Sequence, residues 1–233
     1  MKVWAGTSGF AYKEWKGPFY PEDLPDKEML AHYASRLPTV EINNTFYRMP
    51  SEKLLLGWAE QVPEGFRFAI KASRKITHQK KLAAAEDETE YLLRTVSILE
   101  GRLGPVLFQL PPYLRKDAAR LAAFLDLVPS TIPAAFEFRH ESWLDDETLN
   151  LLAERGKALC VAETEDGLDA PRLGTAGWGY LRLRRTDYSE EDLSAWAARI
   201  AEEGWSDAYV FFKHEDEAGG PRFAERFLEL ACA

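Results

Sequence analysis

Two glutamates interrupt short apolar runs of the sequence. A charged side chain in such a position needs either a counter-charge or a function in a binding or catalytic site. Glu41 and Glu137 each lie between two large apolar residues. Two carboxyl groups held in one site can serve as the acid and the base of a reaction. His78 and His140 follow two of these runs and could shuttle a proton. The predicted catalytic residues are therefore Glu41, Glu137, His78 and His140.

Basic side chains occupy similar positions and outnumber these acids. They are Lys71, Arg139, Arg182 and Lys213. Because buried positive charge without a counter-charge is costly, the excess favours an anionic ligand. Gly219-Gly220-Pro221, before the last helical stretch, could add backbone N–H groups for a phosphate. The predicted substrate-binding residues are Asn43, Tyr47, Lys71, Gln109, Arg139, Arg182 and Lys213.

A purely structural explanation competes with a ligand site. Glu41 and Glu137 could simply neutralise the neighbouring cations as ion pairs, which also occur inside barrels. For any single pair the two explanations weigh equally. The set as a whole, drawn from several strands, favours the ligand site.

Short apolar runs alternate with helical patterns along the chain, which indicates a parallel sheet of the α/β class. The runs cover residues 3–7, 39–43, 66–71, 105–110, 134–138, 158–162, 178–183 and 208–213. Helices are expected at residues 26–37 with Asp26 as cap, 50–58, 86–99 with Gly101 as stop, 117–128, 145–155, 189–200 and 221–227. Residues 163–177 show no helical period, so the helix after strand six is weak or missing.

Eight strands of this kind predict a closed parallel (β/α)8 barrel of the triosephosphate-isomerase (TIM) type. An open doubly wound sheet is less favoured, because no Gly-x-Gly-x-x-Gly turn follows an early strand. Side chains alternate along a strand, and the polar members of the runs fall on the face that points to the barrel axis. Most of them stand at the C-terminal ends of the strands, where barrel enzymes carry their active sites.

Composition limits the class of protein. The chain has 233 residues and a net charge of −9, which fits one barrel domain over residues 1–233 and disfavours a nucleic-acid-binding surface. No apolar run predicts a signal peptide or a membrane span, and two cysteines give no disulfide framework, so we expect a cytoplasmic protein. No cofactor is predicted. A divalent metal held by the glutamates and histidines is an alternative that no ligand motif supports.

Several motifs in fixed order resemble the Domain of Unknown Function 72 family, the YecE-like proteins. They are Gly6-Thr7-Ser8-Gly9-Phe10, Phe19-Tyr20-Pro21, Val40-Glu41-Ile42-Asn43, Ile76-Thr77-His78, the run from Gly104 to Pro112, and Glu137-Phe138-Arg139-His140 with Trp143. The resemblance implies a TIM-type barrel and little about activity. The chain departs from the family pattern at Phe10, Arg184-Arg185 and Lys213-His214, changes that fit a more anionic ligand.

The leading hypothesis is an enzyme that acts on a small anionic substrate, a phosphate ester or a phosphorylated sugar, by carboxylate and histidine acid–base chemistry. A variant is an enzyme that cleaves phosphodiesters at a nucleic-acid end. A different class is a barrel that binds an anionic metabolite without turnover, and a third is a structural barrel with internal ion pairs. No membrane partner is expected.

Overall fold

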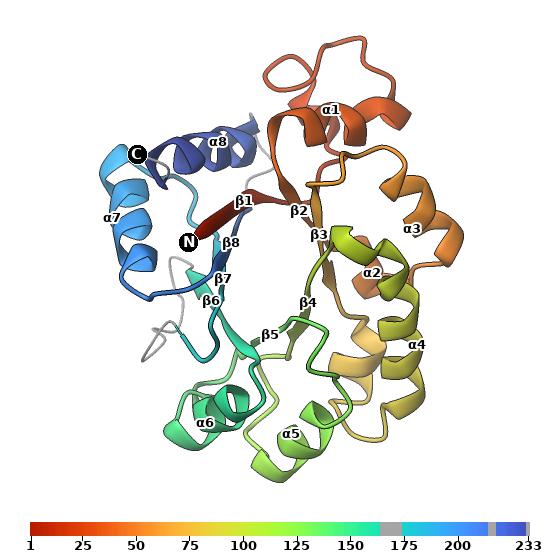
Figure 1. The fold of residues 1–233 in the computed structure, drawn as a ribbon, viewed down its shortest axis with the longest axis vertical. Helices are drawn as coiled ribbons and strands as arrows, with labels where there is room; N and C mark the ends of the chain where they lie inside the picture. The colour runs from red at the N-terminus through yellow and green to blue at the C-terminus, as the bar shows by residue number, and fades with distance from the viewer. Residues whose placement is uncertain (164–173, 214–217, 232–233) are drawn as a thin grey trace.

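The computed structural model describes residues 1–163, 174–213 and 218–231. Eight parallel strands form a closed barrel, surrounded by helices (Figure 1). The strands are β1 (Lys2–Ser8), β2 (Thr39–Ile42), β3 (Arg67–Lys71), β4 (Leu103–Gln109), β5 (Ala134–Glu137), β6 (Ala158–Glu163), β7 (Gly179–Leu183) and β8 (Asp207–Phe212). All eight predicted strands are confirmed, with ends shifted by at most two residues.

The barrel closes between its first and last strands. Residues Lys2 to Thr7 of β1 pair in register with Asp207 to Phe212 of β8. The indole Nε1 of Trp4 also donates a 2.9 Å hydrogen bond to the Asp207 carboxylate. Every strand therefore has two hydrogen-bonded neighbours, and the sheet has no free edge.

Helices follow most strands and cover the outside of the barrel. They are α1 (Met29–Arg36), α2 (Asn44–Tyr47), α3 (Glu52–Ala59), α4 (Glu86–Val96), α5 (Ala118–Leu125), α6 (Asp146–Glu154), α7 (Glu190–Ala201) and α8 (Gly219–Ala231). Side-chain caps fix several starts, as the sequence predicts: the hydroxyl of Ser189 and the carboxylate of Asp192 form a reciprocal capping box at α7. Within the described ranges, no helix combines the length and the apolar character needed to cross a bilayer.

Several helix boundaries differ from the sequence prediction: the helix predicted at 117–128 ends at Leu125, and the last helix runs to Ala231 rather than 227. Asp26 caps no helix: it lies in a 3-10 turn, Asp26–Glu28, that leads into α1. The third predicted helix ends at Val96 and continues as a 3-10 segment in which Glu100, rather than Gly101, takes a positive φ of 48°. The last helix starts at Gly219, two residues before Pro221. The weak helix expected after strand six falls mostly on residues 164–173, outside the described residues.

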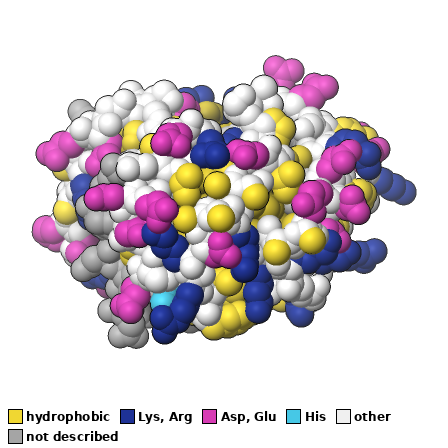
Figure 2. Space-filling model, turned by 90° about the horizontal axis from the view of Figure 1, so that it is seen from below, with side chains coloured by type: hydrophobic (Ala, Val, Ile, Leu, Met, Phe, Trp, Pro, Cys, Tyr) yellow, Lys and Arg dark blue, Asp and Glu magenta, His cyan; other side chains and the backbone are white. Residues whose placement is uncertain are grey.

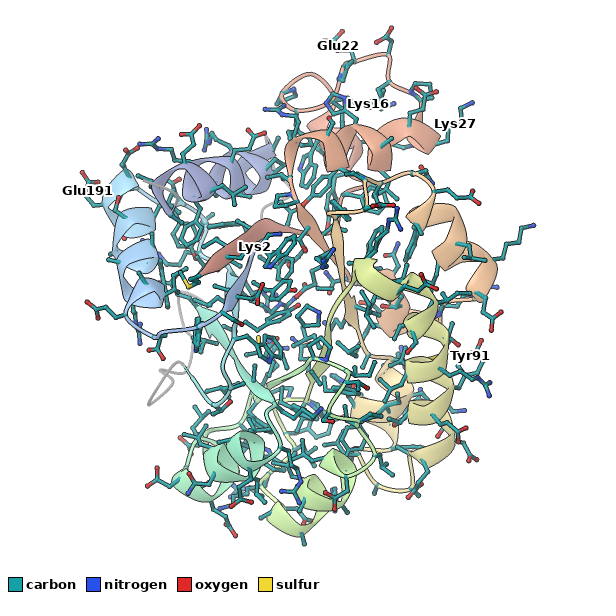
Figure 3. The ribbon with its side chains drawn as sticks, in the orientation of Figure 1. Lys2, Lys16, Glu22, Lys27, Tyr91 and Glu191 are labelled. Atoms are coloured by element: carbon teal, nitrogen blue, oxygen red, sulfur yellow. The ribbon has the colours of Figure 1, made fainter. Side chains whose placement is uncertain are left out.

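The long segment between β1 and α1 folds over the outside of the barrel through aromatic packing. Trp15 and Tyr20 are each only 1% exposed, and their rings lie 6.1 Å apart. Charged residues such as Lys16, Glu22 and Lys27 stand at its outer end, away from the barrel axis (Figure 3). Aromatic burial therefore fixes the course of a segment that has little regular secondary structure.

The side chains inside the barrel form two layers along its axis. The apolar layer contains Trp4, Ala69, Leu107, Ala135, Ala158, Cys160, Tyr180, Tyr209 and Phe211. Burial raises the pKa of the Cys160 thiol well above its usual value, so the thiol is uncharged and inert. The polar layer lies towards the C-terminal ends of the strands and contains Glu41, Glu137 and Arg182, as the alternation predicts.

One glycine permits a very close approach between β1 and β2. A Cβ atom on Gly6 would lie 2.0 Å from the carbonyl oxygen of Thr39. The hydroxyl of Tyr33 donates to that same oxygen at 2.9 Å and accepts from the backbone N–H of Thr7. Only a residue without a side chain fits where these groups meet.

Candidate functional site

Three buried charges form the floor of the site. Arg182 on β7 donates from Nη1 to Glu137 at 2.7 Å and from Nη2 to Glu41 at 2.9 Å. Glu41 is fully buried, and Glu137 and Arg182 are each 2% exposed. We call these three residues the Arg182 triad; it links β2, β5 and β7 across the barrel interior.

Neutral side chains satisfy the remaining carboxylate oxygens. Glu41 accepts hydrogen bonds from the hydroxyls of Ser8 at 2.8 Å and Tyr180 at 2.7 Å. The amide of Asn43 donates to Glu41 at 3.1 Å, and that of Gln109 donates to Glu137 at 2.7 Å. The structural ion pairing considered as an alternative is therefore present for Arg182, and both glutamates are fully engaged.

The triad keeps both carboxyl groups ionised. Burial alone would raise the pKa of Glu41, but the charge of Arg182 and the Tyr180 hydrogen bond outweigh it and hold the pKa at about 2. The same balance of burial against Arg182 and Gln109 lowers the pKa of Glu137. Neither group holds a proton at neutral pH, so neither can be the general acid of a reaction.

Acid should remove the stability that the Glu41 carboxylate contributes. Its folded pKa of about 2 lies below the unfolded value of 4.5, so this stability is complete above about pH 4.5 and is lost as pH falls towards 2. In Glu41→Gln the free energy of unfolding should fall less steeply between pH 4.5 and 3, by up to about 1.4 kcal/mol per pH unit, the value for one proton. Urea unfolding at a series of pH values measures this slope.

Glu191→Gln, on the outer side of α7 (Figure 3), is the matched control and should keep the wild-type slope. A Glu41→Gln protein with an unchanged slope would contradict the ionised state assigned to Glu41.

A cationic cavity of about 660 Å³ opens above the triad. Its described lining residues are Ser8, Tyr12, Asn43, Phe46, Tyr47, Lys71, Arg74, His78, Gln79, Gln109, Tyr113, Arg139, Arg182, Arg184 and Lys213. Six of these are Lys or Arg, and none of those described is Asp or Glu. Elsewhere acidic and basic side chains are mixed, as on the face in Figure 2. The cavity thus concentrates positive charge in a chain whose net charge is −9.

Most of the predicted site residues meet in this cavity. Those that line it are Asn43, Tyr47, Lys71, His78, Gln109, Arg139, Arg182 and Lys213. Glu41 and Glu137 lie beneath it, in the triad. His140 is not among the lining residues: its Nδ1 accepts from the backbone N–H of Ser142 at 3.1 Å and caps the short turn Glu141–Trp143. Gly219 and Gly220 are buried in the first turn of α8 and do not line the cavity either.

The family model described as "Protein of unknown function DUF72" matches residues 4–233 of this chain. The chain belongs to the DUF72 family. A solved DUF72 protein from Thermotoga maritima is similar over the full length of both chains, with 27% identity and a TM-score of 0.88. Another, from Enterococcus faecalis, has 17% identity and a TM-score of 0.79 and covers 100% of this chain and 98% of its own. The resemblance inferred from the sequence motifs and the TIM-type barrel are both confirmed.

Two curated proteins are similar to this chain over part of their length. The UPF0759 protein YecE of Escherichia coli K12 is 33% identical over 133 residues, which cover 54% of this chain and 49% of that relative. The UPF0759 protein YunF of Bacillus subtilis is 25% identical over 79% of this chain and 66% of its own. The match to YecE thus spans about half of that relative.

Several lining residues of this DUF72 barrel escape sequence reasoning. Arg74 and Gln79 belong to the segment after β3 that contains a π-helical turn, Lys75–Gln79. Single π-helical turns are frequent at functional sites, but no simple periodic pattern in a sequence predicts them. Arg184 has the same strand parity as Tyr180 and Arg182, so the alternation of the strand predicts its inward direction, although it is not among the predicted substrate-binding residues.

The titration behaviour of two lining residues follows from the same surroundings. Burial and the nearby Arg182 lower the pKa of Lys71 to about 8. Burial, together with Lys71 and Arg139, lowers the pKa of His78, so its ring is neutral at pH 7. Lys71 can therefore give up a proton near neutral pH, and the neutral ring of His78 has a nitrogen lone pair that can accept one.

Metal ligands are not grouped in the part of this DUF72 chain that the structure describes. No set of three or more His, Cys, Asp or Glu side chains there is placed to hold an ion. The two glutamates that the metal alternative requires have their oxygens committed to Arg182, Ser8, Tyr180 and the amides. The residues present do not fit a metal centre built on Glu41 and Glu137.

Proposed function

We propose that this chain is an enzyme that binds a small phosphorylated or similarly anionic substrate in the cationic cavity. The observation that carries the proposal is the lining of six basic residues without a described acidic one. Cations in a partly enclosed cleft attract anions strongly because the low-dielectric walls focus their field. Nε of Arg182 is also buried without a hydrogen-bond partner among the described residues, so one donor of the triad is unsatisfied.

The basic residues at the mouth would bind the anion. Arg139, with a side chain 42% exposed, and Arg184, half-buried at the end of β7, can give paired N–H donors to a phosphate. Arg74 and Lys213 add positive charge at the rim. Asn43 and Gln109 each donate one amide N–H to the triad, so the second N–H and the amide oxygen of each are what they can offer a substrate hydroxyl.

His78 is the proposed proton carrier. Its ring lines the cavity and is neutral at pH 7, so it can accept a proton from a bound substrate. Thr77 fixes the ring through a 2.9 Å contact between its hydroxyl and Nδ1, which leaves Nε2 for the substrate. Glu41 and Glu137 act on the reaction through Arg182, whose position they set.

A nucleic-acid end is the second candidate ligand, and two tyrosines favour it. Tyr47 and Tyr113 line the cavity yet are 73% and 63% exposed. Tyr91, also exposed, lies instead on the outer side of α4 (Figure 3). Exposed aromatic rings beside a phosphate site suit base stacking. A small substrate remains the first proposal because the overall charge is strongly negative.

Two neighbouring arginines provide the test. Arg184 lines the cavity, whereas Arg185 pairs with Asp192 of α7 at 3.1 Å. Arg184→Gln should weaken the binding of inorganic phosphate or a sugar phosphate by roughly 10- to 150-fold, the range for one lost charge-assisted hydrogen bond. Arg185→Gln should leave the affinity unchanged. Isothermal titration calorimetry measures both.

Equal losses in the two variants, or no phosphate binding by the wild type, would overturn the proposal. If phosphate binds but neither the wild type nor His78→Gln turns over any phosphorylated compound, a barrel that binds its ligand without catalysis becomes the better description. A short single-stranded oligonucleotide that binds more tightly than phosphate, and loses that advantage in Tyr47→Ala, would favour the nucleic-acid end.

A further inference from the structure

Lys71 is the last residue of β3, and its backbone is held on both sides. The hydroxyl of Thr45 donates to the Lys71 carbonyl oxygen at 2.7 Å. Lys71 pairs with Leu107 of β4, and the next residue, Ala72, donates to the Leu107 carbonyl at 2.8 Å. The residue is 9% exposed and lines the cavity. The side chain of Lys71 therefore lines the cavity from the end of a strand whose backbone is held in place.

The amine of Lys71 is not used in a structural ion pair. The ion pairs of the described residues include none to Lys71 within 4.0 Å, although Glu41 and Glu137 are near enough to influence its charge. Both carboxylates are already committed to Arg182. The contact found for its Nζ is with the ring of Phe46, whose centroid is 4.6 Å away.

The surroundings of Lys71 favour a reactive free amine. Burial, Arg182 and Arg184 lower its pKa, while Glu41 and Glu137 partly oppose them, and the result is about 8. Roughly a tenth of the side chains are then uncharged at pH 7, far more than for a lysine in water. A desolvated lysine beside other cations is the usual form of an amine nucleophile.

Lys71 and His78 both contact the ring of Phe46. The Phe46 ring that contacts Lys71 also packs edge-on against His78, with ring centroids 4.9 Å apart. The charge of Lys71 is one cause of the lowered pKa of His78, together with burial, Arg139 and Arg74. The two groups therefore contact the same aromatic ring and interact electrostatically.

We propose that Lys71 is an amine nucleophile that forms an imine with the carbonyl carbon of a phosphorylated aldehyde or ketone. This deepens the proposed function and rests on it, because the other cations hold the phosphate. The uncharged Nζ adds to the carbonyl carbon, and His78 carries one proton from the nitrogen to the alkoxide oxygen, which gives the carbinolamine. His78 then carries the second nitrogen proton to the hydroxyl, which leaves as water while the C=N bond forms. The new C=N bond replaces one C=O bond, and nothing is oxidised or reduced.

Reductive trapping tests the proposal directly. The intact protein is incubated with sodium borohydride and, in turn, dihydroxyacetone phosphate, glyceraldehyde 3-phosphate and pyridoxal 5′-phosphate, three phosphorylated carbonyls of different size. Hydride adds to the imine carbon and leaves a stable secondary amine, which intact-mass measurement and peptide mapping locate. At least one compound should give a single adduct at Lys71. The same compound without its phosphate group should give an adduct yield at least roughly tenfold lower, because the charge-assisted contacts to the phosphate are lost.

Lys71→Arg keeps the positive charge but cannot form the imine, so it should lose the adduct while still binding phosphate. Lys75→Arg is the matched control, because Lys75 begins the π-helical turn that follows β3 and its amine pairs with Glu88 at 2.8 Å. This variant should keep the adduct at Lys71. Adducts spread over many lysines, the same yield without the phosphate group, or no adduct with any compound would overturn the proposal. If phosphate binding measured by calorimetry is intact in that case, the proposed function survives and only the imine is rejected.

Discussion

Replacing Arg182 by methionine should lower the stability of the protein by about 3–5 kcal/mol, the cost of breaking a buried ion pair from one side. The substitution leaves Glu41 and Glu137 buried without their shared counter-charge. For a chain of this size, each kcal/mol lowers the melting temperature by about 2–4 °C, so a drop of roughly 6–20 °C is expected. Thermal and urea unfolding measure the change.

Two further variants test whether the loss of stability in Arg182→Met comes from the broken triad or from the removal of any arginine near the cavity. Arg139→Met removes a side chain that is 42% exposed and 3.8 Å from Glu137, and its stability should stay within about 1 kcal/mol of the wild type. Removing all three charges in the triple variant Glu41→Gln, Glu137→Gln and Arg182→Met should recover much of the loss, because no charge is then left unpaired. An Arg182→Met protein as stable as the wild type would contradict the role assigned to the triad.

Gly6→Ala is the second substitution with a large expected effect. The added methyl group would lie 2.0 Å from the Thr39 carbonyl oxygen, so β1 and β2 must move apart. Forcing extra volume into a packed site costs about 1–3 kcal/mol and sometimes more. The same movement draws Ser8 away from Glu41, so the hydrogen bond between them should be lost as the melting temperature falls.

Gly57→Ala is the control of opposite sign. Gly57 lies inside α3, and nothing stands within 4 Å of the position its Cβ would take. Alanine there should stabilise the protein by about 0.5–1 kcal/mol, because glycine is the weaker helix former. If Gly6→Ala were as harmless as Gly57→Ala in thermal unfolding, the close approach of β1 and β2 would not be the constraint described.

Strand periodicity explains why so much of the barrel could be predicted from the sequence. Residues such as Glu137 and Arg139 alternate with large apolar ones, and a period of two assigns each of them to the axis or to the helices without further information. Because all eight strands are parallel, the axial side chains at their C-terminal ends must meet at one mouth. The Arg182 triad and the cationic cavity follow from that geometry.

The parts that sequence could not supply depend on tertiary distances. The sequence does not say that Arg182 bonds both glutamates and keeps them ionised, because that depends on side-chain reach inside the closed barrel. Similarly, His140 and His78 both follow strands, yet only His78 lines the cavity, since His140 caps its own turn. The π-helical turn that carries His78 has no sequence period that predicts it.

The pairing of β1 with β8 also bears on how the protein is made. A ribosome releases the chain from the N-terminus, so β1 is the first strand to emerge and Asp207–Phe212 the last. Until that final strand arrives, β1 and β7 each present one row of unpaired backbone groups, the kind of edge that pairs with other chains. The barrel can thus close only after β8 has been synthesised, and until then these two open edges are the sites where the nascent chain can pair wrongly.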